Sequence, residues 1–301
     1  MILLDKCPVC GGQNLKFKLN CIDHTASNEV FKIVSCETCD FTFTNPRPDS
    51  TKLGEYYKSD NYISHTNKKN GFFNRTYQLA RNYAIITKLS LVKNVCKKGS
   101  LLDIGCGTGE FLFNCSKKGY KTIGIEPSSL ARKQAIKNFG LTVSEKTDLS
   151  QFSDSQFNII TMWHVLEHIP NLTKTIIEIK RILKNNGKVI IAVPNHKSWD
   201  AKKYKNLWAA WDVPIHLWHF SRNTIKNLFN KNGSKLIKTK PMLLDSFYVS
   251  ILSEKNKTGK NNYIKGIIMG AISNIIGITS KKGCSSTIYV FENNNIAPKP
   301  F

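Results

Sequence analysis

The sequence contains no long apolar run in its 301 residues. No uninterrupted apolar stretch reaches the roughly 20 residues that a helix needs to cross a bilayer, so we expect no membrane span. Cys7 and Pro8 interrupt the N-terminal segment before an apolar stretch can follow a basic start, which predicts no secretory signal. Four of the nine cysteines form two Cys-x-x-Cys pairs. This usage is typical of a reducing cytoplasm and a metal site rather than of a disulfide framework.

Acidic residues are also scarce, since 21 aspartates and glutamates stand against 44 lysines and arginines, a formal charge of +23. Such an excess can indicate nucleic acid, an anionic membrane surface or an acidic substrate. The lysines are scattered rather than gathered on one stripe, and Lys, Asn and Ile are all abundant, as AT-rich codons would make them. We therefore favour a compositional origin of the charge. An apolar fraction of 41% is ample for a buried core, in one large domain or one domain with a smaller appendage.

Residues 1–48 contain the two cysteine pairs and are predicted to form a separate zinc-ribbon module. Each pair flanks a tight turn, and the 25 residues between the pairs alternate as strands do. Four thiolates at this spacing can surround a structural zinc ion tetrahedrally, and the metal stabilises a piece too small to be held by its own core. Cys21 and His24 lie between the pairs and are the weaker candidates. The expected zinc ligands are Cys7, Cys10, Cys36 and Cys39.

The rest of the chain divides into a helical linker and cap over 49–95 and an alternating region over 96–301. In the linker, apolar positions recur at helical spacing from about residue 74 to 92. Between residues 100 and 195, five strand-like segments alternate with three helical segments. This order predicts an α/β fold whose parallel sheet has helices on both faces and binds its ligand at the carboxyl ends of the strands. Two more strands are expected in 235–254 and 284–293.

The stretch LLDIGCGTGEFL at 101–112 places three glycines at alternate positions between a strand and a helix. A dinucleotide-binding loop needs its third glycine where this sequence has Glu110, and a carboxylate at a helix start would repel a pyrophosphate. A nucleoside triphosphate loop is excluded because no Gly-Lys-Ser/Thr follows. The glycines therefore indicate a ligand that approaches the backbone closely and has no phosphate.

The segments LLDIGCGTG, GIEPS, TDL, ITMWHVLEHI and LKNNGKVIIAVPN, in this order, resemble the class I S-adenosylmethionine-dependent methyltransferases over roughly residues 80–293. The resemblance implies a Rossmann-like, doubly wound, mostly parallel seven-stranded sheet with an antiparallel edge strand, beside the small N-terminal zinc ribbon. It also implies that Glu126 accepts from the ribose hydroxyls and that Asp148 and Leu149 bind the adenine. Asp103 would orient the glycine loop or meet the methionine ammonium. The expected cofactor residues are Asp103, Gly105, Gly107, Gly109, Glu126, Asp148, Leu149 and Trp163.

The segment HVLEH at 164–168 also spells His-x-x-Glu-His, a metalloprotease pattern that needs both histidines on one helix. Here it follows a strand-like run and Pro170 ends any helix, so we exclude the protease. The same residues resemble the Glu-His segment of ubiquinone-biosynthesis O-methyltransferases, at the lip of the active site. A hydroxyl acceptor gains from a base with a pKa near 7, for which histidine is the natural choice. The expected catalytic residues are His168, then His216, with Glu167.

An aromatic-rich insertion at 196–225 is expected to cover the acceptor. Its segment PIHLWHFS resembles one seen in many bacterial relatives, and it contains Asp212 and His219 as further candidates. Its tryptophans predict a hydrophobic cap, a stacking surface or helix packing. These are Trp199, Trp208, Trp211 and Trp218. Segment 263–282 is apolar and flanked by lysines, which is typical of a lid or crossover helix or, alternatively, of a contact with an anionic membrane surface.

We therefore expect methyl transfer from S-adenosylmethionine to a small-molecule or glycan-type acceptor, on oxygen. A zinc-ribbon RNA methyltransferase is the alternative, although WHVLEH replaces the Asn/Asp-Pro-Pro-aromatic tetrad that would grip a flipped base. The intact glycine loop, Glu126 and Asp148 argue against a non-enzymatic binding module. The ribbon also resembles that of bacterial sugar C-methyltransferases, whose extra C-terminal domain has no counterpart here, so C-methylation is not carried over.

Overall fold

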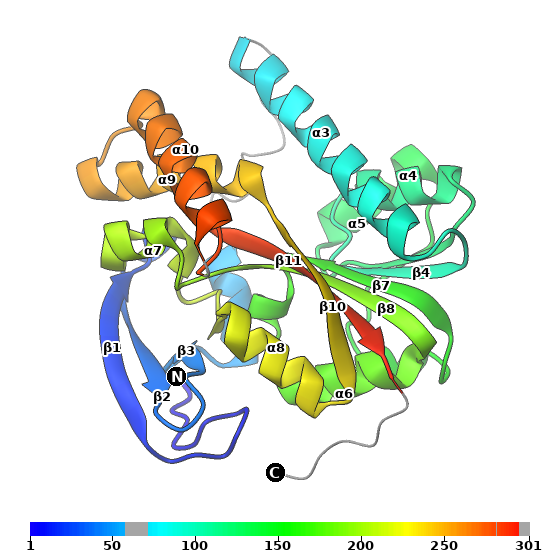
Figure 1. The fold of residues 1–301 in the computed structure, drawn as a ribbon, viewed down its shortest axis with the longest axis horizontal. Helices are drawn as coiled ribbons and strands as arrows, with labels where there is room; N and C mark the ends of the chain where they lie inside the picture. The colour runs from blue at the N-terminus through cyan, green and yellow to red at the C-terminus, as the bar shows by residue number, and fades with distance from the viewer. Residues whose placement is uncertain (58–71, 281, 295–301) are drawn as a thin grey trace.

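A seven-stranded sheet forms the centre of the molecule (Figure 1). The computed structural model describes residues 1–57, 72–280 and 282–294. The strand order is β10-β11-β8-β7-β4-β5-β6, and β11 runs antiparallel to both of its neighbours while the other paired strands are parallel. The strands are β4 (Ser100–Ile104), β5 (Lys121–Ile125), β6 (Val143–Ser144), β7 (Phe157–Trp163), β8 (Leu183–Pro194), β10 (Ser234–Pro241) and β11 (Ser286–Asn293). The predicted mostly parallel α/β fold with an antiparallel edge is confirmed.

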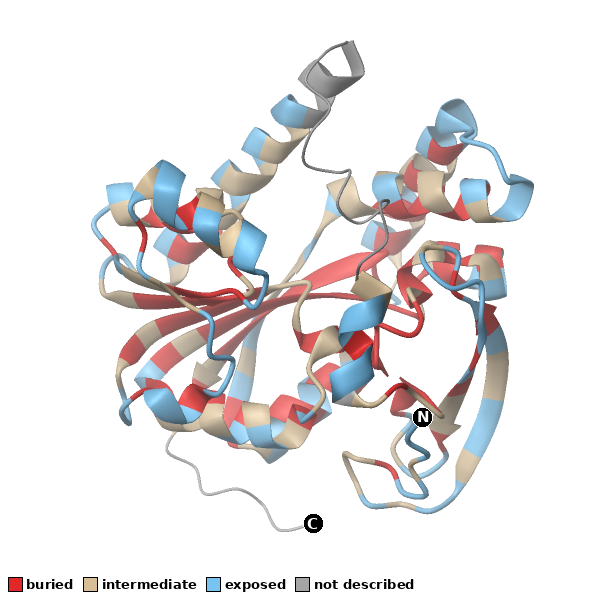
Figure 2. Cartoon of the chain, turned by 180° about the vertical axis from the view of Figure 1, so that it is seen from behind, coloured by how far each residue is buried: buried red, intermediate tan, exposed pale blue. Residues whose placement is uncertain are grey.

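Helices cover both faces of this sheet, whose central strands are almost wholly buried (Figure 2). The helix expected near 74–92 is α3, and it lies with α4 and α5 on one face, opposite α6 and α8. Local signals fix some of their ends: the Ser128 hydroxyl caps α5, and Gly140 ends it at φ 62°. The helices are α3 (Phe72–Val95), α4 (Glu110–Lys117), α5 (Ser129–Phe139), α6 (Leu172–Ile182) and α8 (Arg222–Lys231).

A second, four-stranded sheet joins the N-terminal region to the insertion. Its order is β1-β2-β3-β9, all antiparallel, and β9 comes from the insertion rather than from the N-terminal segment. The buried ring of Phe41 packs against Trp218 and Phe220, with centroids 5.8 and 5.9 Å away. The elements are β1 (Leu15–Ile22), β2 (Val30–Cys36), β3 (Thr42–Thr44) and β9 (Trp218–His219), followed after β3 by α1 (Ser50–Leu53) and η1 (Gly54–Tyr57). The sequence did not indicate this shared sheet.

The strand predicted over 235–254 is wrong in its second half. Strand β10 ends at Pro241, and the chain continues as helices α9 (Leu243–Thr258) and α10 (Tyr263–Thr279). In α9 the buried side chains include Ser246, Val249, Ser250 and Ser253, a helical spacing in which small polar residues take the inner positions. The third helix also ends earlier than predicted, because residues 183–187 already belong to β8. Among the described helices, none is long and apolar enough to cross a membrane.

Candidate active site

The carboxyl end of β4 holds a buried carboxylate. Asp103 is 2% exposed and accepts a 2.6 Å hydrogen bond from the Thr161 hydroxyl on the neighbouring strand β7. Burial raises the pKa of Asp103 to about 7, although the Thr161 hydrogen bond and the Lys88 ammonium both oppose the shift. This carboxyl group therefore fixes the end of β4 against β7, where the glycine loop begins.

The three glycines of the loop all have positive φ, but they face different surroundings. A Cβ on Gly105 would lie 2.4 Å from Val165, and one on Gly109 would lie 2.7 Å from Leu141. These two glycines are required by close packing inside the protein. Gly107, at φ 55°, has open space where its side chain would be. The loop therefore presents bare backbone to a ligand at Gly107.

Glu126 follows β5 and lies directly beside this loop. Its carboxylate accepts one hydrogen bond from the Gly107 N–H and one from the Ser128 N–H, both 2.8 Å long. The side chain is 9% exposed, so it is held rigidly at the edge of the loop. The sequence placed this carboxylate correctly at the end of the second strand, next to the glycines.

The remaining expected cofactor residues lie at the ends of the next elements. Asp148 caps the short 3₁₀ helix η3 (Leu149–Gln151) and is exposed, whereas Leu149 is 4% exposed. Trp163 ends β7, and its buried indole N–H has no acceptor among the described residues. An unsatisfied buried donor costs free energy, so this N–H points to a missing ligand.

Two basic residues of α3 reach the same region, and the sequence did not indicate either. The ammonium of Lys88 lies 4.6 Å from the centre of the Trp163 ring, and burial lowers its pKa. Arg81 donates to the Thr108 hydroxyl and to Glu110, two residues that follow Gly107 in the sequence. Helix α3 thus brings positive charge to the loop.

His164 follows β7 and is clamped between two carboxylates. Its Nδ1 lies 3.2 Å from Glu167, and its Nε2 lies 2.7 Å from Asp245 at the start of α9. Burial alone would lower the pKa of His164, but the two carboxylates outweigh burial and raise it to about 10. The residue is therefore an imidazolium that ties α9 to the end of β7.

Glu167, His168 and His216 come together beyond this clamp, with one ligand atom of each within 4.8 Å of the others. His168 Nδ1 lies 3.1 Å from the Ile215 carbonyl and 3.0 Å from the Tyr57 hydroxyl. His216 Nδ1 lies 3.0 Å from a main-chain carbonyl, that of residue 210. Donation to these carbonyls places the proton of each neutral ring on Nδ1 and leaves a lone pair on Nε2.

Burial controls the charge of this cluster. It lowers the pKa of His168 to about 4, helped by the nearby His216, and also lowers the pKa of His216. The pKa of Glu167 falls despite burial because His164 pairs with it, and one of its oxygens has no hydrogen-bond partner among the described residues. Burial raises the pKa of Asp212 to about 6. The cluster therefore holds two neutral imidazoles, which can accept a proton or bind a metal, beside a carboxylate.

The insertion contains α7 (Trp199–Tyr204), η5 (Lys205–Leu207) and η6 (Ala209–Trp211), and η6 supplies the carbonyl that lies beside His216. Three of its tryptophans donate their indole N–H groups inside the protein, to Asp200, Lys205 and Ile169 respectively. These are Trp208, Trp211 and Trp218, all buried. Trp208 and Trp211 pack against each other, whereas Trp218 packs on Phe41 of the second sheet. His219 is buried too, and it pairs with the Thr44 hydroxyl of the second sheet at 3.1 Å.

The four N-terminal cysteines meet in one cluster. The Cys7 and Cys39 sulfurs are 3.6 Å apart and the Cys10 and Cys36 sulfurs are 3.5 Å apart, too far for disulfides. Sulfurs around a tetrahedral zinc ion with bonds of about 2.3 Å would be about 3.8 Å apart, so the cluster has the size of such a site. Cys21, the alternative candidate, lies in a separate buried core with Phe31 and Ile33.

Comparison with known proteins connects this geometry to a family. The model of the family described as "Methyltransferase domain" matches residues 74–239. The sterol 4-C-methyltransferase strm-1 of Caenorhabditis elegans is 33% identical over 118 residues, 36% of this chain and 33% of that protein. A ubiquinone biosynthesis O-methyltransferase of Pasteurella multocida is 30% identical over 118 residues, 33% of this chain and 48% of that protein.

These alignments cover about half or less of each relative. The structure of magnesium protoporphyrin IX methyltransferase from Synechocystis PCC 6803 with bound SAH has 14% identity, a TM-score of 0.54, and covers 82% of this chain and all of that one. At this identity the likeness concerns the fold alone. Since the family model spans more than half of the described sequence, the chain belongs to the methyltransferase-domain family and has the fold of S-adenosylmethionine-dependent methyltransferases.

Proposed function

We propose that the protein transfers the methyl group of S-adenosylmethionine to a hydroxyl oxygen of a small-molecule or glycan-type acceptor. One contact supports this most directly: Val165, in the segment that carries the histidines, packs against Gly105 of the glycine loop. The cofactor loop and the neutral imidazoles therefore adjoin each other. A named ubiquinone O-methyltransferase among the relatives favours a small oxygen acceptor, and nothing at the end of β7 favours RNA.

S-adenosylmethionine fits the residues at the loop. Gly107 offers bare backbone facing open space, Glu126 offers a carboxylate for the ribose hydroxyls, and the Trp163 N–H lacks an acceptor. Asp148 and Leu149 would bind the adenine, and Asp103 would hold the loop. When bound, the cofactor supplies an electrophilic sulfonium methyl group. We assign the methionine carboxylate to the side of the site that Lys88 makes positive.

The histidine cluster would receive the acceptor proton. As the oxygen–methyl bond forms and the methyl–sulfur bond breaks, the hydroxyl becomes acidic and its proton passes to the Nε2 lone pair of His168 or His216. The main-chain carbonyls hold the rings in the required tautomer. Glu167, buried at the centre of the cluster, stabilises the resulting positive charge. Positioning and exclusion of water supply the rest of the rate.

The assay uses zinc-loaded protein, labelled S-adenosylmethionine and a panel of phenolic, glycan and lipid-linked acceptors. Substituting His168→Gln and His216→Gln should together lower kcat by about 10² to 10⁴-fold and leave S-adenosylhomocysteine affinity unchanged. His24→Gln, an exposed position in the second sheet's loop, is the matched control. If the double variant forms product at the wild-type rate, neither histidine acts as the base. A strict requirement for added divalent cation would replace it by a metal site.

A further inference from the structure

In the hairpin of α9 and α10, small residues of α10 are buried and its large aliphatic residues are exposed. The buried residues of α10 are Gly266, Gly270, Ser273, Asn274 and Gly277. Its isoleucines point outward instead: Ile264 is 76% exposed, Ile275 65% and Ile278 62%, and two more are about half exposed. A surface helix of an ordinary globular protein turns its apolar stripe to the core and its small or polar residues to water.

Close approach of the two helices explains which residues are inside. A Cβ on Gly266 would lie 2.6 Å from the Ile251 Cα, and one on Gly270 would lie 2.7 Å from the Phe247 Cα. A larger side chain at either position would force the helices apart. Across the same interface, the Ser246 hydroxyl of α9 donates to Asn274. The hairpin is thus held by small and hydrogen-bonded groups, which leaves the aliphatic face without any partner in the described chain.

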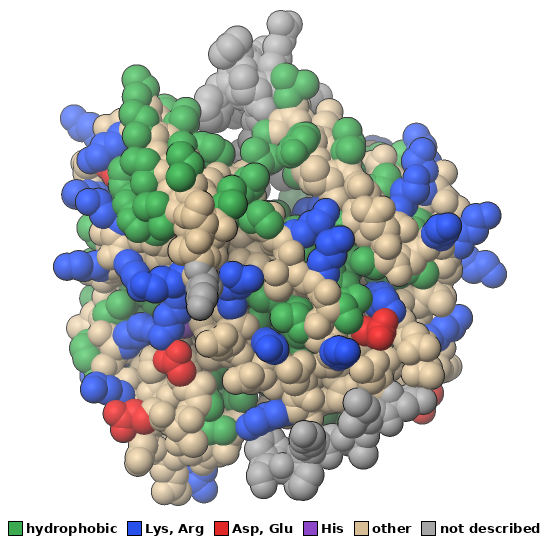
Figure 3. All heavy atoms as spheres, in the orientation of Figure 1, with side chains coloured by type: hydrophobic (Ala, Val, Ile, Leu, Met, Phe, Trp, Pro, Cys, Tyr) green, Lys and Arg blue, Asp and Glu red, His purple; other side chains and the backbone are tan. Residues whose placement is uncertain are grey.

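The exposed face is large and continuous. Hydrophobic side chains gather over the hairpin, with lysines and arginines beside them (Figure 3). Contiguous apolar surface of this kind is rare on a protein with no partner and marks a contact site. Helix α3 carries a second exposed row, Leu79, Tyr83 and Ile86, and it projects from the same end of the molecule (Figures 1 and 2).

Lysines dominate the charge of this segment. Residues 255–280 and 282 include five lysines and no aspartate or glutamate. Glu254, which precedes the segment, is buried and paired with Lys265 at 3.1 Å. Lysines of this kind attract anionic surfaces, whereas two copies of the same hairpin would repel each other when brought face to face.

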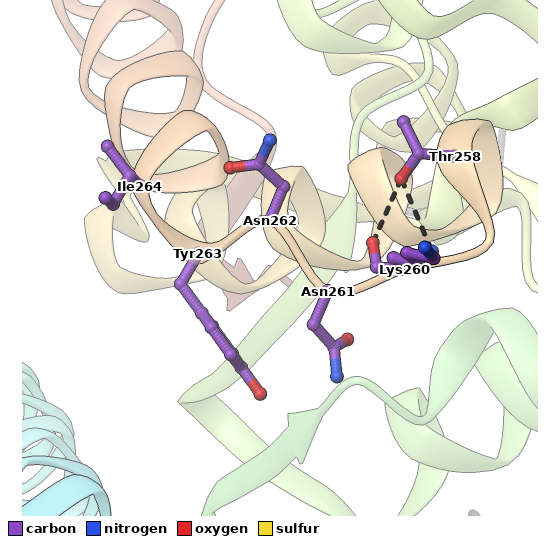
Figure 4. A pocket seen from close by; sticks show the side chains of 6 residues that line it. All are labelled: Thr258, Lys260, Asn261, Asn262, Tyr263 and Ile264. Carbon is purple, nitrogen blue, oxygen red and sulfur yellow. Dashed lines mark hydrogen bonds between the residues drawn. The ribbon is translucent and has the colours of Figure 1, made fainter.

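The tip of the hairpin adds a hollow of about 510 Å³, lined by more apolar than polar surface (Figure 4). Figure 4 shows Asn261 and Tyr263 extending on one side of the turn, while Ile264 points away from them. An amide, a phenol and an ammonium beside an aliphatic residue are the groups found where a protein meets lipid headgroups. The lining residues are Thr258, Lys260, Asn261, Asn262, Tyr263 and Ile264.

We propose that the α9–α10 hairpin docks on the surface of an anionic lipid bilayer. The isoleucines enter the boundary between headgroups and acyl chains, the lysines meet the anionic headgroups, and the helix lies on the membrane without crossing it. The hairpin is joined to the catalytic region, because Asp245 of α9 pairs with His164. If the protein has the proposed function, this docking implies that the acceptor is a membrane-borne amphiphile, which enters the site from the lipid side. This second step rests on the proposed function.

Vesicle flotation tests the docking without any activity measurement. The full-length protein should bind vesicles of phosphatidylcholine and phosphatidylglycerol, about 2:1, much better than pure phosphatidylcholine, and salt should weaken the binding. The double variant Ile264→Glu/Ile275→Glu should bind at least about 30-fold more weakly. Ile136→Glu/Ile177→Glu, which makes the same change at exposed isoleucines of α5 and α6, should bind as wild type does.

The hairpin variant should bind S-adenosylhomocysteine and unfold thermally as wild type does. Its weaker vesicle binding then does not come from a folding defect. If the wild-type protein does not bind anionic vesicles at low salt, the proposal is wrong. Self-association that the hairpin variant abolishes, measured by light scattering, also overturns it, because a second copy would then cover the face. Vesicle binding by a protein that does not bind the cofactor would contradict the proposed function and still support the docking.

Discussion

At the scale of single residues, Glu126 carries the clearest prediction. The substitution Glu126→Gln keeps the shape of the side chain but removes the charge that favours ribose hydroxyl donors. Hydrogen bonds to a charged group contribute about 1.5–3 kcal/mol, so affinity for S-adenosylhomocysteine should fall about 10- to 100-fold. Isothermal titration calorimetry measures this directly. Glu292→Gln is the control, because Glu292 pairs with Lys188 at the opposite end of β8 from the glycine loop.

Thermal unfolding of both variants accompanies the titration, since Glu126 also accepts the N–H groups of Gly107 and Ser128. A folded Glu126→Gln protein that binds as tightly as wild type would contradict the assigned ribose contact. An equal loss of affinity in Glu292→Gln would show that the effect is not local to the loop.

The sequence locates candidate site residues where chemistry and chain position coincide. Asp103 and Glu126 are carboxylates that end strands next to a glycine loop, so the pattern located both. Lys88, Tyr57 and Asp245 reach the same region from α3, η1 and α9. Nothing in their local sequence distinguishes them from ordinary surface residues, because only the tertiary packing brings them to the strand ends.

At the scale of elements, the N-terminal cysteine turns predict a metal-dependent piece. We expect one zinc ion per chain, and Cys36→Ser should release it and lower the unfolding temperature by several degrees, because a structural zinc site supplies folding free energy. Strand β3 pairs with β9, so loss of the metal should also loosen the segment of His219. Metal analysis measures the loss of zinc, and thermal unfolding measures the loss of stability.

Cys96→Ser is the matched control for the zinc prediction. Cys96 lies outside the cluster and donates to the Lys98 carbonyl, so this variant should keep its zinc. Wild-type protein purified without any metal, or a Cys36→Ser protein with a full complement of zinc, would contradict the ribbon. Binding of S-adenosylhomocysteine by the metal-free variant would show that the α/β region folds without the ribbon.

Element predictions failed where the usual inside–outside pattern is inverted. The run Phe247, Tyr248 and Val249 favours a strand by its residue types, yet it lies within α9. The helical period is carried by buried serines, of which Ser246 donates to Asn274 of α10 and Ser253 accepts from the Ala209 N–H of η6. A search for apolar periodicity does not detect small polar residues as a buried face. The alternating region from β4 to β8 keeps the ordinary pattern, and there the strand–helix order was predicted correctly.

At the scale of the whole molecule, buried ionisable groups predict how stability depends on pH. Burial lowers the pKa of five histidines, which in the unfolded chain would titrate near 6.5. These are His24, His168, His196, His216 and His219. Below pH 6.5 unfolding therefore takes up protons at these rings. Asp103 and Asp212, whose pKa values are raised to about 7 and about 6, release about two protons on unfolding in the same range.

Because five rings take up protons and two carboxyl groups release them, the net uptake should make the free energy of unfolding fall as the pH drops from 6.5 to 4.5. On the alkaline side His164 acts in the opposite sense, since its pKa is raised to about 10. Its stabilisation is complete below pH 6.5 and is lost as the pH rises towards 10, at up to about 1.4 kcal/mol per pH unit. Lys18, whose pKa burial lowers to about 8, acts in the opposite sense above pH 8. The test is therefore the difference between variants in urea unfolding. His164→Gln should change the alkaline limb and leave the acid limb in place, and an alkaline limb that this variant leaves unchanged would contradict the clamped imidazolium.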